Sequence, residues 1–292
     1  MKINLLILLI ITGIAYGCGP RKLSEKELAE IHLQKTDSLF NKEAYNAAKL
    51  HIESIHTQYP KEIAVRKKAN SILYSIELIE YKRNLIYADS VIRIKQKELD
   101  SITKIFRFEK NNQYQTIGNY VYKHQITEYN PTGTYIKAFV DENGLFYLSS
   151  HYCGTYPINH FVTRFNIKDV YAETDTVTQE GFNHSFTDND KYFERVIYKS
   201  EANKDIGTLI QQNSGKTIVV TLQGKKKKYT FWLSTNEKKA ITEAYNLAVV
   251  LGDFKNLERI IDVSKKKIIF LENIIQTDLK KDTTQKTKKP LK

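Results

Sequence analysis

Two long series of apolar residues at heptad spacing constrain the fold of this 292-residue chain more than any other feature. The steps in each series alternate between three and four residues, a 3.5-residue period that is typical of a coiled-coil seam. At ~1.5 Å per residue, the two seams would be roughly 50 and 43 Å long. The first seam comprises Tyr74, Leu78, Tyr81, Leu85, Ala88, Ile92, Lys95, Leu99, Ile102 and Phe106. The second comprises Leu247, Val250, Phe254, Leu257, Ile261, Ser264, Ile268, Leu271 and Ile275.

The similar lengths of the two seams indicate that they are partners. Because the chain leaves by one seam and returns by the other, an intramolecular pair must be antiparallel. Leu99 would then face the region of Phe254, and Leu78 the region of Ile275. The alternative is that either seam self-associates into a homodimer.

A helical hairpin is predicted before the first seam. Ser24 and Glu27 form a capping-box pattern that starts a helix running to Asn41. A second helix is predicted over residues 43–58, and Pro60 ends it.

This hairpin resembles a single tetratricopeptide-type unit. It departs from that motif at His32 and Lys35, where the motif prefers large apolar residues. Because one such unit cannot bury its own apolar face, the resemblance implies that the next helix covers it. The apolar positions that match the motif are Leu39, Ala48, Ile52 and Ile55.

Between the seams the apolar period changes from 3.5 to two, which indicates antiparallel strands. Turn sequences at residues 130–133 and 141–144 separate the first strands, and Ser234 with Glu237 repeats the capping-box pattern before the last helix. The predicted strands cover residues 120–129, 134–140, 145–152, 158–166, 192–199, 217–222 and 228–233.

The predicted fold class is therefore α+β, with a β-meander between the two helices of an antiparallel coiled coil. The predicted segments are a signal peptide (1–17), a lipidated tether (18–23), a helical hairpin plus long helix (24–110), a β-rich domain (111–233), a C-terminal long helix (234–277) and a basic disordered tail (278–292).

The first 18 residues have the pattern of an export signal. Lys2 is followed by an apolar run over residues 3–14, which is too short to span a bilayer by the ~20-residue criterion. Ala15-Tyr16-Gly17 directly before Cys18 resembles a bacterial lipobox, so Cys18 is expected to carry palmitate and anchor the protein to a membrane. Ala15 and Gly17 also suit an ordinary signal peptidase, which leaves plain secretion as the alternative.

The formal net charge of +12 is concentrated in two runs, residues 279–292 and residues 225–228. An exported protein rarely meets nucleic acid, so no nucleic-acid partner is expected. Anionic lipid headgroups or anionic envelope polymers are the expected counter-ions. The alternative is that the runs are a solvated turn and tail without any partner.

One cluster of side chains could ligate a metal, namely His151, Cys153 and His160, but no paired zinc-binding motif accompanies it. If Cys18 is acylated, Cys153 has no disulfide partner, and it is expected to be a small buried apolar residue. No thiol-protease signature surrounds Cys153, and no glycine-rich phosphate loop is present. We therefore assign no catalytic residue, no cofactor and no metal.

Several short strings together resemble an uncharacterised family of envelope lipoproteins from Bacteroidota. The strings lie at residues 87–90, 108–110, 118–123, 141–144 and 157–160, and the resemblance covers roughly residues 20–260. It implies an envelope address and no known activity. The basic residues at 19–22 favour a periplasm-facing position.

The expected function is that of a non-enzymatic, lipid-anchored interaction or scaffold module. A carbohydrate- or peptidoglycan-binding lipoprotein is the alternative, since tyrosine rings can stack on sugars. A periplasmic hydrolase or metal enzyme is the third hypothesis.

Overall fold

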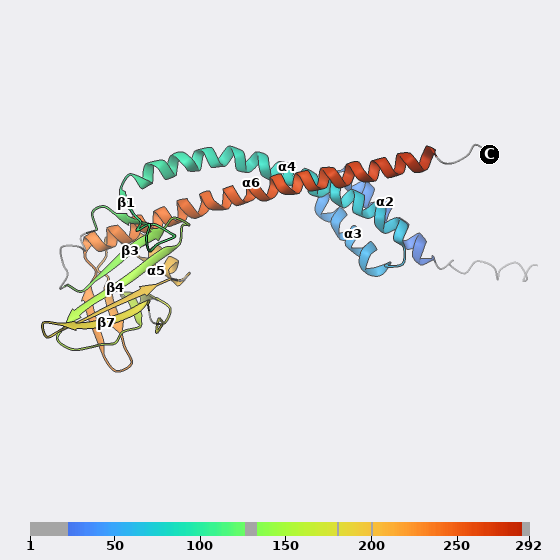
Figure 1. The fold of residues 1–292 in the computed structure, drawn as a ribbon. Helices are drawn as coiled ribbons and strands as arrows, with labels where there is room; N and C mark the ends of the chain where they lie inside the picture. Colours follow the sequence, from blue (N-terminus) through green and yellow to red (C-terminus); the bar gives the residue numbers. More distant parts are fainter. Residues whose placement is uncertain (1–22, 126–132, 180, 200, 288–292) are drawn as a thin grey trace, which may run out of the picture. The chain divides into compact units, whose positions relative to one another are not determined.

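The structure is a computed structural model that describes residues 23–125, 133–179, 181–199 and 201–287. The predicted signal peptide and the predicted lipidation site, Cys18, lie outside the described residues. The chain divides into two compact units, with residues 86–262 in unit 2 and the preceding and following residues in unit 1 (Figure 1). Within the described part, no helix is both long enough and apolar enough to cross a membrane.

The fold is α+β, as predicted. The helices are α2 (Glu25–Asn41), α3 (Tyr45–Gln58), α4 (Ile63–Thr103), α5 (Ala202–Gln212) and α6 (Thr235–Thr287). The strands are β1 (Phe106–Glu109), β2 (Asn119–Tyr122), β3 (Tyr135–Asp141), β4 (Phe146–Gly154), β5 (Val162–Ile167), β6 (Val170–Glu173), β7 (Asn183–Asp188), β8 (Lys191–Tyr198), β9 (Val219–Gln223) and β10 (Lys228–Trp232).

Unit 1 contains the helical hairpin α2–α3 and the first part of α4. The predicted capping box is present, because Ser24 accepts from the Glu27 amide while the Glu27 side chain bonds the Ser24 amide. As the resemblance implied, α4 covers the hairpin with buried apolar residues such as Val65 and Ile76. The residues of α2 and α3 in this core include Ala29, Leu33, Ala48, Ile52 and Ile55.

The two heptad seams pair within one chain as an antiparallel coiled coil, which confirms the prediction. In unit 1, Lys82 Nζ of α4 lies 2.8 Å from a Glu272 carboxylate oxygen of α6. In unit 2, Lys95 Nζ lies 3.0 Å from Asp253, so the polar member of the first seam has a partner across the pair. None of the seam residues is fully exposed.

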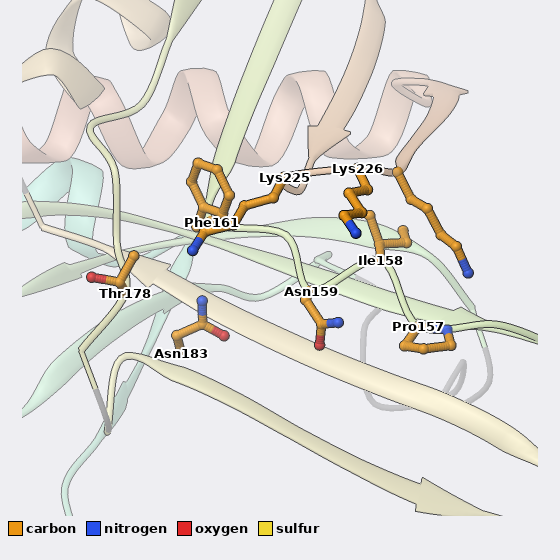
Figure 2. Close-up of a pocket in the computed structure, with 9 residues that line it drawn as sticks. Pro157, Ile158, Asn159, Phe161, Thr178, Asn183, Lys225 and Lys226 are labelled. Carbon is orange, nitrogen blue, oxygen red and sulfur yellow. The ribbon is translucent and has the colours of Figure 1, made fainter.

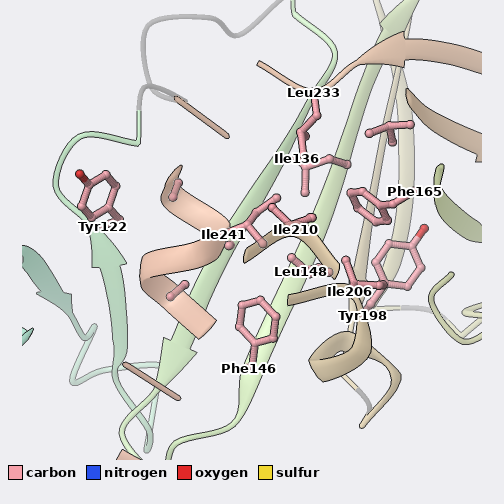
Figure 3. Packing of buried hydrophobic residues seen from close by; sticks show 14 of the residues in the cluster. Tyr122, Ile136, Phe146, Leu148, Phe165, Tyr198, Ile206, Ile210, Leu233 and Ile241 are labelled. Atoms are coloured by element: carbon pink, nitrogen blue, oxygen red, sulfur yellow. The ribbon is translucent and has the colours of Figure 1, made fainter. Parts of the chain in front are cut away.

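Unit 2 is built on two antiparallel sheets. The larger has the strand order β1-β2-β3-β4-β8-β7, and the smaller has the order β10-β9-β5-β6. Their core also receives side chains from α5 and from the first turns of α6 (Figure 3). Members of this core include Ile136, Phe146, Leu148, Phe165, Val220, Ile206, Ile210 and Ile241.

Several predicted boundaries are wrong. Helix α4 ends at Thr103, and Phe106 begins β1, where its ring packs 5.9 Å from Tyr122 across the β1–β2 ladder. Unit 2 therefore contains a strand before residue 111. Helix α6 continues to Thr287, so residues 278–287 are helical rather than part of a disordered tail.

The strand predictions also need correction. The strand expected at 158–166 begins only at Val162, because the preceding residues form a tight loop. Strand β2 ends at Tyr122, and residues 126–132, including most of the predicted 130–133 turn, lie outside the described residues. Strands β6 and β7 and helix α5 were not predicted.

Candidate functional site

A buried polar network connects the two sheets of unit 2. Ser150 Oγ on β4 lies 2.7 Å from His160 Nε2, and His160 Nδ1 lies 2.6 Å from Glu194 Oε2 on β8. The Tyr198 hydroxyl lies 3.3 Å from Ser150 Oγ and 3.0 Å from Thr163 Oγ1 on β5. The network therefore ties strands of the six-stranded sheet to a strand of the four-stranded sheet.

The order serine, histidine, glutamate in this network has the hydrogen-bond pattern of a hydrolase triad. A nucleophile must be reachable by its substrate, however, and Ser150 and His160 are both 0% exposed. The Ser150 hydroxyl is also bonded to Tyr198. The arrangement therefore stabilises the fold and presents no nucleophile at the surface.

The Glu194 carboxylate holds the loop between β4 and β5. One oxygen accepts hydrogen bonds from the amides of Ile158 and Asn159 at 2.6 and 2.7 Å, and the other accepts from the His160 amide at 3.0 Å. Burial acts to raise the pKa of Glu194, but the hydrogen bonds from the His160 side chain and the three amides outweigh it, so the pKa lies below its ordinary value. Asn159 takes a positive φ of 53° within this loop.

The opposite face of the six-stranded sheet carries stacked aromatic pairs. Strand alternation directs the odd-numbered residues of β3, β4 and β8 away from the core. We call this surface the open face. Its stacked pairs, each formed by residues directly opposite on adjacent strands, are Tyr135 with His151 at 4.5 Å, Phe139 with Tyr147 at 4.8 Å, and Phe186 with Phe193 at 4.9 Å between ring centroids.

Several of the charged side chains beside these rings are basic. Arg195 lies opposite His151 in the β4–β8 ladder, and Lys199 Nζ lies 5.8 Å from the centroid of the Tyr147 ring. Burial lowers the pKa of His151 to about 3, with smaller contributions from Arg195, Lys137 and His160, so this imidazole is neutral at physiological pH. Its Nε2 lies 3.1 Å from Ser149 Oγ.

A hollow of about 440 Å³ lies on the open face. Its volume is within the range of about 300–1,000 Å³ that is usual for small-molecule sites. Side chains from four adjacent strands meet there, and they combine flat rings with hydrogen-bonding nitrogen groups. The lining includes Tyr135, His151, His184, Phe186, Phe193 and Arg195.

A second hollow, of about 510 Å³, lies beside the loop that Glu194 holds (Figure 2). We call it the lysine pocket. The loop supplies Pro157, Ile158, Asn159 and Phe161, and the β9–β10 hairpin supplies Lys225, Lys226 and Lys227. Thr178 and Asn183 complete the lining.

The structure separates His160 from His151 and Cys153, the other two residues that we considered as metal ligands. His160 belongs to the buried polar network, whereas His151 projects from the other face of β4. Cys153 is only partly buried, so the expectation of a small buried apolar residue is wrong. Among the described residues, no group of three or more His, Cys, Asp or Glu side chains is placed to hold a metal ion.

The residues that organise this region could not be predicted from the sequence. Ser150, Glu194 and Tyr198 belong to two strands whose apolar pattern was recognised, yet no local motif marks them. The one sequence signal for this network is Glu194, a glutamate within the alternating pattern of residues 192–198. A carboxylate at a buried strand position needs hydrogen-bond partners. The sequence shows the lysine run at 225–228, but it does not show that this run lies beside an apolar loop.

No protein-family model matches this sequence, and no curated protein sequence or solved structure is significantly similar to it.

Proposed function

We propose that this protein is a non-enzymatic cell-envelope protein, anchored by lipid on Cys18, whose unit 2 acts as an interaction module. The observation that carries the proposal is the open face, where three stacked ring pairs and several cations lie outside the buried core. Aromatic rings with interleaved arginine are typical of binding surfaces. Localisation to the cell envelope is supported by the export signal and by the resemblance to Bacteroidota lipoproteins, and the basic segment 19–22 favours the periplasmic side.

Carbohydrate is the second candidate ligand, and a specific observation favours it. Sugar rings stack on flat aromatic faces, while their hydroxyl groups need nearby hydrogen-bonding groups. The hollow on the open face offers both, with Tyr135 and His151 stacked beside Arg195. The Arg195 guanidinium would also suit a glycan that carries carboxylates, such as peptidoglycan.

We expect Cys18→Ala to move the protein from the detergent phase to the soluble fraction, because acyl chains supply membrane affinity of ~0.8 kcal/mol per buried methylene. The measurement is phase partitioning of cell extracts followed by immunoblotting. Cys153→Ser is the matched control, and it should leave the partitioning unchanged. A Cys18→Ala protein that still enters the detergent phase would contradict lipid anchoring.

A photoreactive phenylalanine analogue at position 186 should cross-link a component of the envelope in living cells, because Phe186 is 53% exposed on the open face. The same analogue at position 171 is the control, since Tyr171 is 56% exposed on β6 of the other sheet. A product that protease degrades identifies a protein partner, and one that a peptidoglycan hydrolase degrades identifies the carbohydrate. No product at position 186, or equal products at both positions, would remove the open face as the binding surface.

A further inference from the structure

We propose that the lysine pocket binds an amphipathic anion, namely a phosphate or carboxylate group joined to an alkyl chain. This site is separate from the open face, so the proposal goes beyond the function proposed above. The pocket volume of about 510 Å³ is large enough for a small organic ligand.

The walls of the pocket are fixed by contacts within the protein. A Cβ atom on Gly224 would lie 2.1 Å from the Ile158 carbonyl oxygen, so the β9–β10 turn sits directly on the loop and leaves no room for a side chain there. The Phe161 amide donates to the Gln223 carbonyl at 3.0 Å, and Asn183 Nδ2 donates to the His160 carbonyl at 3.0 Å. Glu194 fixes the loop from the interior. A preformed pocket loses little entropy when it binds a ligand.

The charge of the pocket favours an anion. Three successive lysines line it, and none of the lining residues that the structure describes is acidic. Within the described part of the chain, Lys225 and Lys226 form no ion pair, and Lys227 Nζ lies 4.9 Å from the centroid of the Tyr156 ring. Adjacent cations without counter-charges repel one another, and a bound anion would relieve that repulsion.

The apolar residues of the pocket require that the anion carry an alkyl chain. Figure 2 shows the side chains of Lys225 and Lys226 beside Phe161 and Ile158. A small hydrated ion would leave this apolar surface in contact with water, whereas a neutral alkyl compound would leave the lysines without counter-charge. An amphipathic anion provides a counter-charge for the lysines and also covers the apolar surface. It can be a dispersed alkyl phosphate or fatty acid, or a membrane lipid with an anionic headgroup.

The test is calorimetric titration of the mature full-length protein with octyl phosphate below its micelle-forming concentration. Butyl phosphate, inorganic phosphate and neutral octyl glucoside are titrated for comparison. We expect octyl phosphate to bind at least tenfold more tightly than butyl phosphate, because each buried methylene adds affinity. Lys226→Gln should weaken binding about tenfold, as expected for the loss of a charge-assisted hydrogen bond. Lys228→Gln removes the same charge from the same hairpin outside the pocket lining, and it should change binding less than twofold.

The outcomes separate the proposal from non-specific attraction. The proposal would be overturned if octyl glucoside or inorganic phosphate bound as tightly as octyl phosphate. It would also be overturned if Lys226→Gln and Lys228→Gln weakened the binding of octyl phosphate equally. Flotation with vesicles of phosphatidic acid or of phosphatidylcholine shows whether the ligand is a membrane lipid or a dispersed compound. Selective binding to phosphatidic acid vesicles that Lys226→Gln removes supports a membrane lipid as the ligand. Binding of octyl phosphate without vesicle binding supports a dispersed ligand.

Discussion

Replacing Glu194 with glutamine is expected to lower the free energy of unfolding by about 3–5 kcal/mol, because it removes one charge from a buried, hydrogen-bonded cluster. The carboxylate accepts from the amides of Ile158, Asn159 and His160 and from the His160 ring. A glutamine side chain has one acceptor oxygen, and its NH2 group would face donors. Urea denaturation measures the loss, and amide hydrogen exchange should show faster opening at residues 158–160.

The matched control for that variant is Glu173→Gln. Glu173 pairs with Arg164 at 2.6 Å, but both side chains are about 40% exposed. A surface ion pair of this kind contributes about 0–1 kcal/mol, so the control should unfold almost like the wild type. Equal losses in the two variants would show that the Glu194 contacts add nothing beyond a surface pair.

The difference in the free energy of unfolding between the wild type and Glu194→Gln should also depend on pH. The pKa of Glu194 is lower in the folded protein than its ordinary value of 4.5. A carboxyl of this kind stabilises the fold above its unfolded-state pKa, and that stability is lost as pH falls through the folded-state pKa. The difference in unfolding free energy should therefore narrow as the pH falls below about 4.5. A difference that stays constant down to pH 3 would contradict the role of the ionised carboxylate.

Leu271→Ala should destabilise the protein by about 2–4 kcal/mol, because it removes a large side chain from the coiled-coil seam. Leu271 is 1% exposed, whereas its neighbour Phe270 is 55% exposed. Phe270→Ala is therefore the control, and its effect should stay within about 0.5 kcal/mol. The measurement is denaturant unfolding of both variants. If Phe270→Ala costs as much as Leu271→Ala, another surface covers the outer side of α6, as self-association would require.

The sequence predicted the long helices well because heptad spacing is a signal that accumulates over many turns. Each seam contains at least nine positions, so a single polar member such as Lys95 or Ser264 does not hide the period. The capping boxes at Ser24 and Ser234 are equally local, since all their atoms lie within four residues, and both are present. The residues of β7 are mostly exposed, so they give no alternation from which to predict a strand.

The features missed from the sequence depend on contacts between distant residues. Helix α5 is anchored by Asn203, whose Nδ2 donates to the carbonyls of Phe146 and Tyr198. A buried asparagine in a short helix gives no sign of where it will dock. His160 was considered as a metal ligand, but its partners Ser150 and Glu194 lie on strands that the sequence alone could not place side by side. The lysine run also gives no sign in the sequence that the neighbouring Gly224 packs against Ile158.

The division of unit 1 into two segments of sequence sets the order in which it can be completed. Ribosomes produce the chain from its N-terminus, so α2, α3 and the first part of α4 exist before residues 263–287 are made. All of residues 86–262 must be synthesised in between, which takes roughly 9–35 s at about 5–20 residues per second. Throughout that interval the seam residues of α4 before Ile86 lack their partner helix. The nascent chain therefore exposes an apolar stripe on α4 until the C-terminal part of α6 has been synthesised.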